Sequence, residues 1–143
     1  MRTLPTLLIA LATFASASCN TAGPSDGDSD GNIVIESPTL PVAPGSTLAL
    51  ALANHTEHVV HAGALPCTVT VERRINGKWE PTGGGEPICP AIAIIIDAGT
   101  RHEFTTQAPG SLGTFRFVTT VSEGNAGGLR IYSQPLNVVV FTY

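Results

Sequence analysis

The sequence predicts an all-β fold in which two sheets pack face to face as a Greek-key sandwich. Glycine and proline recur at short intervals, with 15 and 11 copies in 143 residues, and mark the turns between many short strands. The apolar stretches between them are short, and none keeps the 3.6-residue period of a helix for three turns. About 110 residues follow the polar N-terminal part, which is the usual size of one sandwich.

Residues 1–18 have the composition of a signal peptide, so we leave them out of the fold. Arg2 precedes an uncharged apolar run from Leu4 to Ala17. As a helix this run would span ~21 Å, which is shorter than the ~30 Å hydrocarbon core of a bilayer. We therefore expect an export signal and not a transmembrane anchor.

Two cleavage positions compete at the end of this segment. Residues 15–17, Ala-Ser-Ala, have the small-x-small form that would release a product beginning at Ser18. Residues 16–19, Ser-Ala-Ser-Cys, resemble the lipobox of bacterial lipoproteins, with Ser16 where that family has leucine or another aliphatic residue. This resemblance implies that Cys19 is acylated and becomes the new N-terminus.

Residues 19–31 contain small and acidic side chains and no large apolar one. Such a segment cannot bury enough surface to order itself, so we predict a flexible acidic tether. The composition then shifts toward apolar residues, and we assign residues 32–143 to one folded domain.

The domain begins with three predicted strands. Residues 33–36 form the first, which ends before the prolines at positions 38, 41 and 44. Residues 47–53 alternate, and the leucines at positions 48, 50 and 52 share one face, which indicates a central strand. After a turn at residues 54–57, residues 59–62 form a short third strand.

The stretch from Cys67 to Cys89 is typical of a β-hairpin closed at its base by two cysteines. Its first strand alternates, with Val69, Val71 and Ile75 on one face and Thr70, Glu72 and Arg74 on the other. Asn76-Gly77 then supplies the positive φ angles of a two-residue type I′ turn, and residues 78–82 form the return strand.

The register of this hairpin has two solutions. A two-residue turn places Arg74 opposite Trp79 at cation-π distance and Arg73 opposite Glu80 as an ion pair. A bulged turn slipped by one residue would instead put Trp79 on the face of Val71, where its large apolar area favours burial. The sequence leaves both registers open.

A disulfide between Cys67 and Cys89 fits the hairpin. The two-residue register places Cys67 opposite Glu86, and the glycines at positions 83–85 can absorb the remaining offset of three residues. The bond would close a loop of 23 residues, counting both cysteines, and disfavour the unfolded chain by ~3 kcal/mol. Two free buried thiols are the alternative, but an exported chain meets an oxidising compartment. Pairing these two leaves Cys19 as an odd thiol, which favours the acylated product.

The second half of the domain continues the strand pattern. Residues 91–97 form an apolar run that we expect to be buried on both sides. Residues 102–106 and 113–121 are the next strands, the latter with Phe115 and Phe117 inward and Arg116 outward. Strands at residues 129–132 and 136–142 end the chain, separated by a proline that suits an edge or a bulge.

Residues 47–121 resemble the bacterial immunoglobulin-like domains of small cell-envelope lipoproteins. The resemblance lies in an apolar strand ending in Asn54, a cysteine before Val-x-Val-Glu-Arg, Asn-Gly-x-Trp at positions 76–79, a second cysteine, Asp-Ala-Gly-Thr at 97–100 and Gly-Thr-Phe-Arg at 113–116. Ala98 and Phe115 depart conservatively from the family pattern. The resemblance implies an immunoglobulin-like sandwich and a place in the cell envelope, and it implies no ligand.

Three histidines form the only cluster with ligand chemistry that we single out. His55 and His61 share a face of an extended chain while His58 points away, and ~20 Å separates the outer pair. Given this spacing, we prefer to interpret them as a polar turn followed by half-exposed strand residues. Metal binding by His55, His58 and His61 is therefore kept as an alternative, and no cofactor is predicted.

The charge balance restricts the partners. Removal of Arg2 with the signal leaves six of the seven basic side chains against eleven acidic ones, a net charge of −5. An acidic surface disfavours nucleic acid and anionic membrane surfaces as partners.

We therefore predict a non-enzymatic exported lipoprotein module with a binding or structural role in the bacterial cell envelope. A lipid anchor would hold it to a membrane, and an envelope protein is the expected kind of partner. A second hypothesis is a proteinase inhibitor, because another immunoglobulin-like bacterial family with a similar strand-Asn-turn opening is associated with protease inhibition. Its reactive loop would lie at residues 83–87 or 123–128.

Overall fold

The computed structural model describes residues 32–142, apart from residues 84–87 and 125–126. These residues form ten strands: β1 Ile33–Glu36, β2 Thr47–Asn54, β3 Val60–Ala62, β4 Thr70–Ile75, β5 Lys78–Pro81, β6 Ile94–Ile96, β7 Arg101–Gln107, β8 Gly113–Glu123, β9 Leu129–Tyr132 and β10 Leu136–Val138. No helix long and apolar enough to cross a membrane occurs in this part of the chain. The predicted signal peptide, tether and Cys19 lie outside it.

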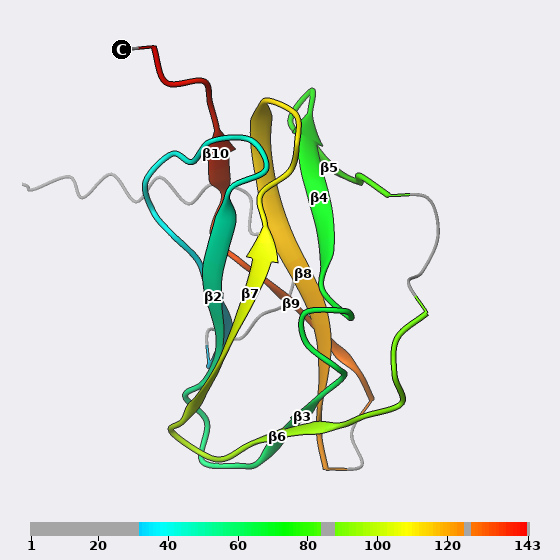
Figure 1. Cartoon of the computed structure of the whole chain (residues 1–143). Helices are drawn as coiled ribbons and strands as arrows, with labels where there is room; N and C mark the ends of the chain where they lie inside the picture. Colours follow the sequence, from blue (N-terminus) through cyan, green and yellow to red (C-terminus); the bar gives the residue numbers. More distant parts are fainter. Residues whose placement is uncertain (1–31, 84–87, 125–126, 143) are drawn as a thin grey trace, which may run out of the picture.

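The smaller sheet has three antiparallel strands in the order β1-β2-β7. The central place of β2 confirms the prediction from its alternating leucines, all three of which are at most 3% exposed. This placement stabilises β2, because a central strand forms backbone hydrogen bonds along both edges while the leucine face packs into the core. Figure 1 shows β2 and β7 side by side in front of the second sheet.

The larger sheet has seven strands and is organised around β8. One edge of this 11-residue strand pairs with β4 and β3, and the other with β10 and β9. Strand β5 lies outside β4, and β6 lies outside β3. Two isolated parallel bridges lie at the side of the sandwich: Ile35 of β1 pairs with Ser133, just after β9, and Val42, between β1 and β2, pairs with Val138 of β10.

The two sheets form an immunoglobulin-like Greek-key sandwich, as the sequence predicts. The chain crosses between sheets after β2, after β6 and after β7, so that β7 returns to pair with β2. Both inner faces supply the core. Its buried members include Ile33, Ile35, Leu48, Leu50, Leu52, Val60, Ile96, Phe104, Phe117, Val121, Ile131 and Leu136.

The hairpin has the two-residue register. Asn76 and Gly77 have φ angles of 50° and 82°, which the type I′ turn requires. Arg74 is paired with Trp79 in the ladder, and its guanidinium carbon lies 5.9 Å from the ring centroid. Arg73 is opposite Glu80, but its Nη2 donates to the carbonyl of Leu112 and its guanidinium lies over Phe115. The expected Arg73–Glu80 ion pair is absent from the described residues.

The apolar run at residues 91–97 differs from its prediction. Only Ile94–Ile96 form a strand, and this strand is an edge that pairs with β3 alone. Ile96 is 2% exposed, whereas Ile95 is 63% exposed and Ile92 is 60% exposed. Burial on both sides was wrong because an edge strand with one face on the core turns alternate side chains to solvent. The last strand also ends earlier than predicted, at Val138.

Asn54 connects two turns at one end of the sandwich. Its side chain is fully buried, and Nδ2 lies 2.7, 3.0 and 3.2 Å from the carbonyl oxygens of His58, Ile96 and Asp97. Its Oδ1 accepts hydrogen bonds from the backbone N and the Oγ1 of Thr56. The asparagine at the end of β2 therefore links the β2–β3 and β6–β7 connections by hydrogen bonds of its side chain.

Candidate functional site

The outer face of the seven-stranded sheet carries a cluster of arginine and aromatic side chains. Strand alternation places these residues there: the odd positions of β4 and β8, such as Val71 and Phe117, point into the core, so the even positions point out. We define the arginine-aromatic face as Glu72 and Arg74 of β4, Trp79 of β5, Arg116 of β8, and Arg130 and Tyr132 of β9.

Glu72 is the centre of this face. Its Oε2 accepts from Nε and Nη2 of Arg116, both at 2.7 Å, and its Oε1 accepts from Nη2 of Arg130 at 2.9 Å. The glutamate side chain is 7% exposed and that of Arg116 is 11% exposed. Both carboxylate oxygens are therefore engaged by cations, which compensates for their burial.

Two aromatic rings enclose the guanidinium of Arg116. Its central carbon lies 4.5 Å from the Trp79 ring centroid and 4.0 Å from that of Tyr132. Arg130 also lies over Tyr132, at 5.5 Å. Such cation-π contacts contribute from ~0.5 to 2 kcal/mol each, with the larger values at desolvated sites. The stacking therefore holds Arg116 and both rings in a fixed arrangement.

The two outer faces of the sandwich differ in charge. The arginine-aromatic face has three arginines and one glutamate, whereas the register of the three-stranded sheet places Glu36 and Glu103 beside Arg101 on its outer face. Arg101 is ion-paired with both carboxylates, at 3.4 and 2.6 Å. An acidic chain thus carries a local cationic surface on one sheet.

A cleft of about 990 Å³ adjoins the arginine-aromatic face. Glu72 and Arg130 line one side of it, and Thr68, Thr70 and Thr120 supply hydroxyl groups to its wall. A second cleft of about 500 Å³ lies further along the same sheet and includes His61 and Ile92. The outer surface of the larger sheet therefore has both charged side chains and concave clefts, and both are typical of a binding surface.

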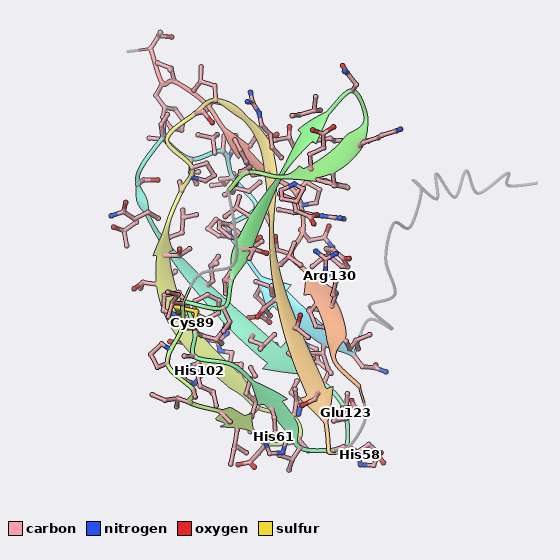
Figure 2. All side chains as sticks on the ribbon, turned by 90° about the vertical axis from the view of Figure 1, so that its right-hand side faces the viewer. His58, His61, Cys89, His102, Glu123 and Arg130 are labelled. Atoms are coloured by element: carbon pink, nitrogen blue, oxygen red, sulfur yellow. A yellow bond between two sulfur atoms is a disulfide. The ribbon has the colours of Figure 1, made fainter. Side chains whose placement is uncertain are left out.

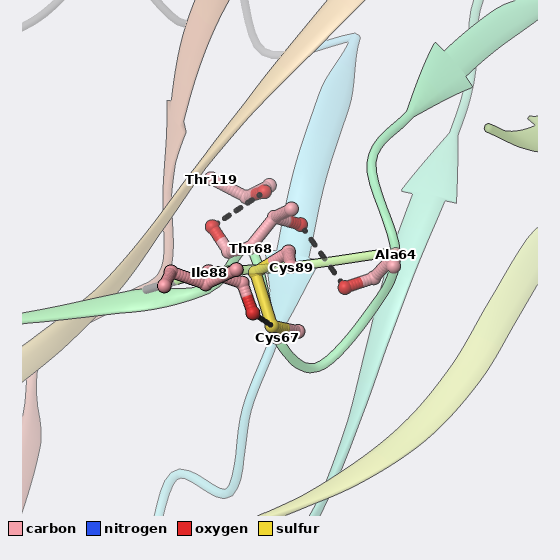
Figure 3. Close-up of a disulfide and its surroundings, with 6 residues drawn as sticks. All are labelled: Ala64, Cys67, Thr68, Ile88, Cys89 and Thr119. Atoms are coloured by element: carbon pink, nitrogen blue, oxygen red, sulfur yellow. Dashed lines mark hydrogen bonds between the residues drawn. A yellow bond between two sulfur atoms is a disulfide. The ribbon is translucent and has the colours of Figure 1, made fainter. Parts of the chain in front are cut away.

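The disulfide predicted by the sequence is present. Cys67 and Cys89 are bonded with their Cα atoms 5.6 Å apart, and Cys67 Sγ lies 3.8 Å from the carbonyl oxygen of Ile88 (Figure 3). Hydrogen bonds from Thr68 to Ala64 and from Thr119 to Thr68 surround the bond. The bond therefore ties the segment after β5 to the entry of β4.

The histidines do not gather in one place. His55 and His58 are exposed in the turn after β2, His61 is half-buried on the outer face of β3, and His102 belongs to the other sheet. Figure 2 shows His58 and His61 at one end of the sandwich, with His102 on a separate strand. In the described chain, no group of three or more His, Cys, Asp or Glu could hold a metal ion. Metal binding by His55, His58 and His61 stays an untested prediction.

Other predicted positions lie partly outside the described residues. The inhibitor hypothesis placed a reactive loop at residues 83–87 or 123–128, and residues 84–87 and 125–126 are not described. The same holds for Cys19. These hypotheses stay predictions.

No family model matches the chain, and no curated protein matches it. Among solved structures, the chain is similar to the X-ray structure of Northeast Structural Genomics Consortium target SoR45, with a TM-score of 0.51 and 13% identity over 78% of this chain and 89% of that one. These values show a shared fold alone. An ASH/PapD-like domain of human CEP192 aligns with a TM-score of 0.38 and 14% identity, over 96% of this chain and all of that one.

The sequence indicates single members of the arginine-aromatic face but not that they lie together. The pairing of Arg74 with Trp79 and the outward direction of Arg116 are readable from alternation. Glu72 is 44 residues from Arg116 and 58 residues from Arg130 along the chain, so only the pairing of β4, β8 and β9 brings them together. A glutamate on the outward side of a strand was the available signal, and its burial was not foreseen.

Proposed function

We propose that this protein is an exported, lipid-anchored immunoglobulin-like module with a non-enzymatic binding role in the bacterial cell envelope. Cys19 is its acylation site, and the segment of residues 19–31 links the anchor to the sandwich. The domain presents its outer sheet surface to another envelope protein.

The disulfide is the observation that carries this proposal. A bond between Cys67 and Cys89 is typical of an oxidising, extracytoplasmic compartment. The chain has three cysteines, so this bond leaves Cys19, which stands two residues after the apolar N-terminal run. Acylation gives that remaining thiol a chemical role that agrees with the compartment.

The chemistry of the arginine-aromatic face supports binding in preference to catalysis. Its one carboxylate holds two arginines, and all three side chains fix one another. A general base needs a carboxylate that can reach the proton it accepts. Glu72 instead organises the cationic surface.

The experiment is metabolic labelling with a fatty acid in a bacterial host that exports the full chain. We expect label in the wild-type protein and none in Cys19→Ala. The control is the Cys67→Ser/Cys89→Ser double variant. It should keep the label, because it retains Cys19 and loses only the two cysteines of the domain. Equal labelling of wild type and Cys19→Ala would refute the lipid anchor.

A further inference from the structure

We propose that the arginine-aromatic face is a docking surface for a carboxylate-rich segment of a protein partner. This inference deepens the proposed binding role by assigning its site and the chemistry of its partner, and it rests on that role. The lipid anchor is a separate claim, and the test below does not use it.

Local charge is the first argument. Three arginines share the outer face of the larger sheet with a single buried carboxylate, which leaves two positive charges in excess. Screening limits each exposed charge to about 8 Å at physiological ionic strength. A short anionic segment bound to this face would therefore be attracted by the arginines more strongly than it is repelled by the acidic side chains elsewhere on the domain.

Arg130 provides the contact point. Its side chain is 57% exposed, and one guanidinium nitrogen, Nη2, forms the ion pair with Glu72. A guanidinium has five N–H donors in a planar fork that matches a carboxylate. Because Glu72 and the ring of Tyr132 fix one side of the group, less conformational entropy is lost when a partner carboxylate binds the other side.

The surrounding residues have the composition of a protein interface. Tryptophan, tyrosine and arginine dominate interaction hot spots, and here Trp79 and Tyr132 are half-buried with Arg116 between them. Thr68 and Thr70 line the 990 Å³ cleft beside Arg130, and their hydroxyls donate to the carbonyl oxygens of Ala64 and Val118. The same hydroxyl oxygens can accept hydrogen bonds from the backbone N–H groups of an extended peptide.

The same charges argue against an anionic bilayer as the occupant. A bilayer is an extended negative surface that would also meet the acidic residues of the domain and the three aspartates at positions 26, 28 and 30. Attraction is about 1 kcal/mol for each basic residue near such a surface, and the chain as a whole has a net charge of −4. A peptide avoids this repulsion because it contacts one face only.

The test is an NMR titration of the full mature chain with a hexaglutamate peptide, using hexaglutamine as the uncharged control peptide. The mature chain carries Cys19→Ser so that no acyl group is present. We expect hexaglutamate to shift the Trp79 indole and the Arg130 and Arg116 side-chain signals, and to lose affinity as salt is raised. Hexaglutamine should shift none of them.

Two arginine variants make the test specific. Arg130→Glu should weaken hexaglutamate binding about tenfold, which corresponds to ~1.4 kcal/mol. Arg101→Glu is the matched control, since Arg101 is 58% exposed and also ion-paired on the opposite sheet. It should weaken binding less than twofold. Arg130→Gln does not place a second carboxylate beside Glu72 and should weaken binding about threefold. It keeps the test valid if the Arg130→Glu variant does not fold.

Several results would overturn the proposal. One is an equal effect of Arg130→Glu and Arg101→Glu, and another is shifts confined to residues outside the face. Binding of the chain to phosphatidylglycerol vesicles without binding to hexaglutamate would assign the face to a membrane. Equal fatty-acid labelling of the wild-type protein and Cys19→Ala, together with hexaglutamate binding at the arginine-aromatic face, would refute the anchor alone. Labelling that depends on Cys19, without hexaglutamate binding at this face, would refute the docking surface alone.

Discussion

The substitution Glu72→Gln tests the physical organisation of the arginine-aromatic face. Glutamine keeps the shape of the side chain but removes the charge, and it replaces one acceptor oxygen with an NH₂ donor that must face an arginine. Arg116, at 11% exposed, would then be a buried cation without its carboxylate. We therefore expect a loss of stability that a surface ion pair would not show.

The magnitude follows from burial. Removing one partner of a buried ion pair costs ~3–5 kcal/mol, whereas a half-exposed pair such as that of Arg130 contributes only ~0.2–1 kcal/mol. Contacts of Arg116 with Trp79 and Tyr132 remain and offset part of the loss. The expected decrease in the free energy of unfolding is thus about 3 kcal/mol, out of a total of ~5–15 kcal/mol for such a domain.

The assay is equilibrium unfolding in urea at pH 7, followed by tryptophan fluorescence. Trp79 is the single tryptophan of the chain and belongs to the face, so it reports directly on the cluster. Glu103→Gln is the control, because Glu103 is 70% exposed and pairs with an exposed arginine, and it should cost less than ~1 kcal/mol. A Glu72→Gln loss no larger than that of Glu103→Gln would refute the reasoning.

Three further changes probe the fold, each measured by the same urea unfolding. Asn54→Ala should cost about 2–4 kcal/mol, because three carbonyl oxygens and Thr56 lose their partner. Cys67→Ser/Cys89→Ser should cost ~3 kcal/mol, since the loop between the two positions is no longer closed. Gly77→Ala should cost ~1–2 kcal/mol, because a φ of 82° is unfavourable for a residue with a Cβ.

Each of these predictions has its own contradicting outcome. An Asn54→Ala loss below ~1 kcal/mol would mean that water replaces the amide. Alkylation of both Cys67 and Cys89 in the non-reduced protein would show that the disulfide does not form. Gly45→Ala is the matched variant for Gly77→Ala, because Gly45 lies in a loop with a similar φ of 69°, and the two losses should be similar. A negligible loss in Gly77→Ala would contradict the attribution of its cost to backbone strain.

Local signals in the sequence sufficed for much of the fold. Asn76-Gly77 predicted the hairpin and its turn because few other dipeptides tolerate two positive φ angles. The alternating leucines of β2 predicted a central strand with the leucines on one face, and the structure confirms it. The isoleucine run at residues 91–97 was misjudged, since hydrophobicity reports a preference for burial but not whether a strand lies at the centre or the edge of a sheet.

The sequence by itself determined where most of the strands and the hairpin turn lie and which two cysteines pair, because each depends on chemistry within a few residues or on a loop of modest length. It left the hairpin register open. The tertiary structure alone decided that Glu72, Arg116 and Arg130 meet, since their contacts require β8 to pair with β4 on one edge and with β9 on the other. Which strands pair, and therefore which of these side chains become neighbours, depends on how the two whole sheets pack. No local pattern carries that information, and the surface proposed for binding is therefore a property of the fold.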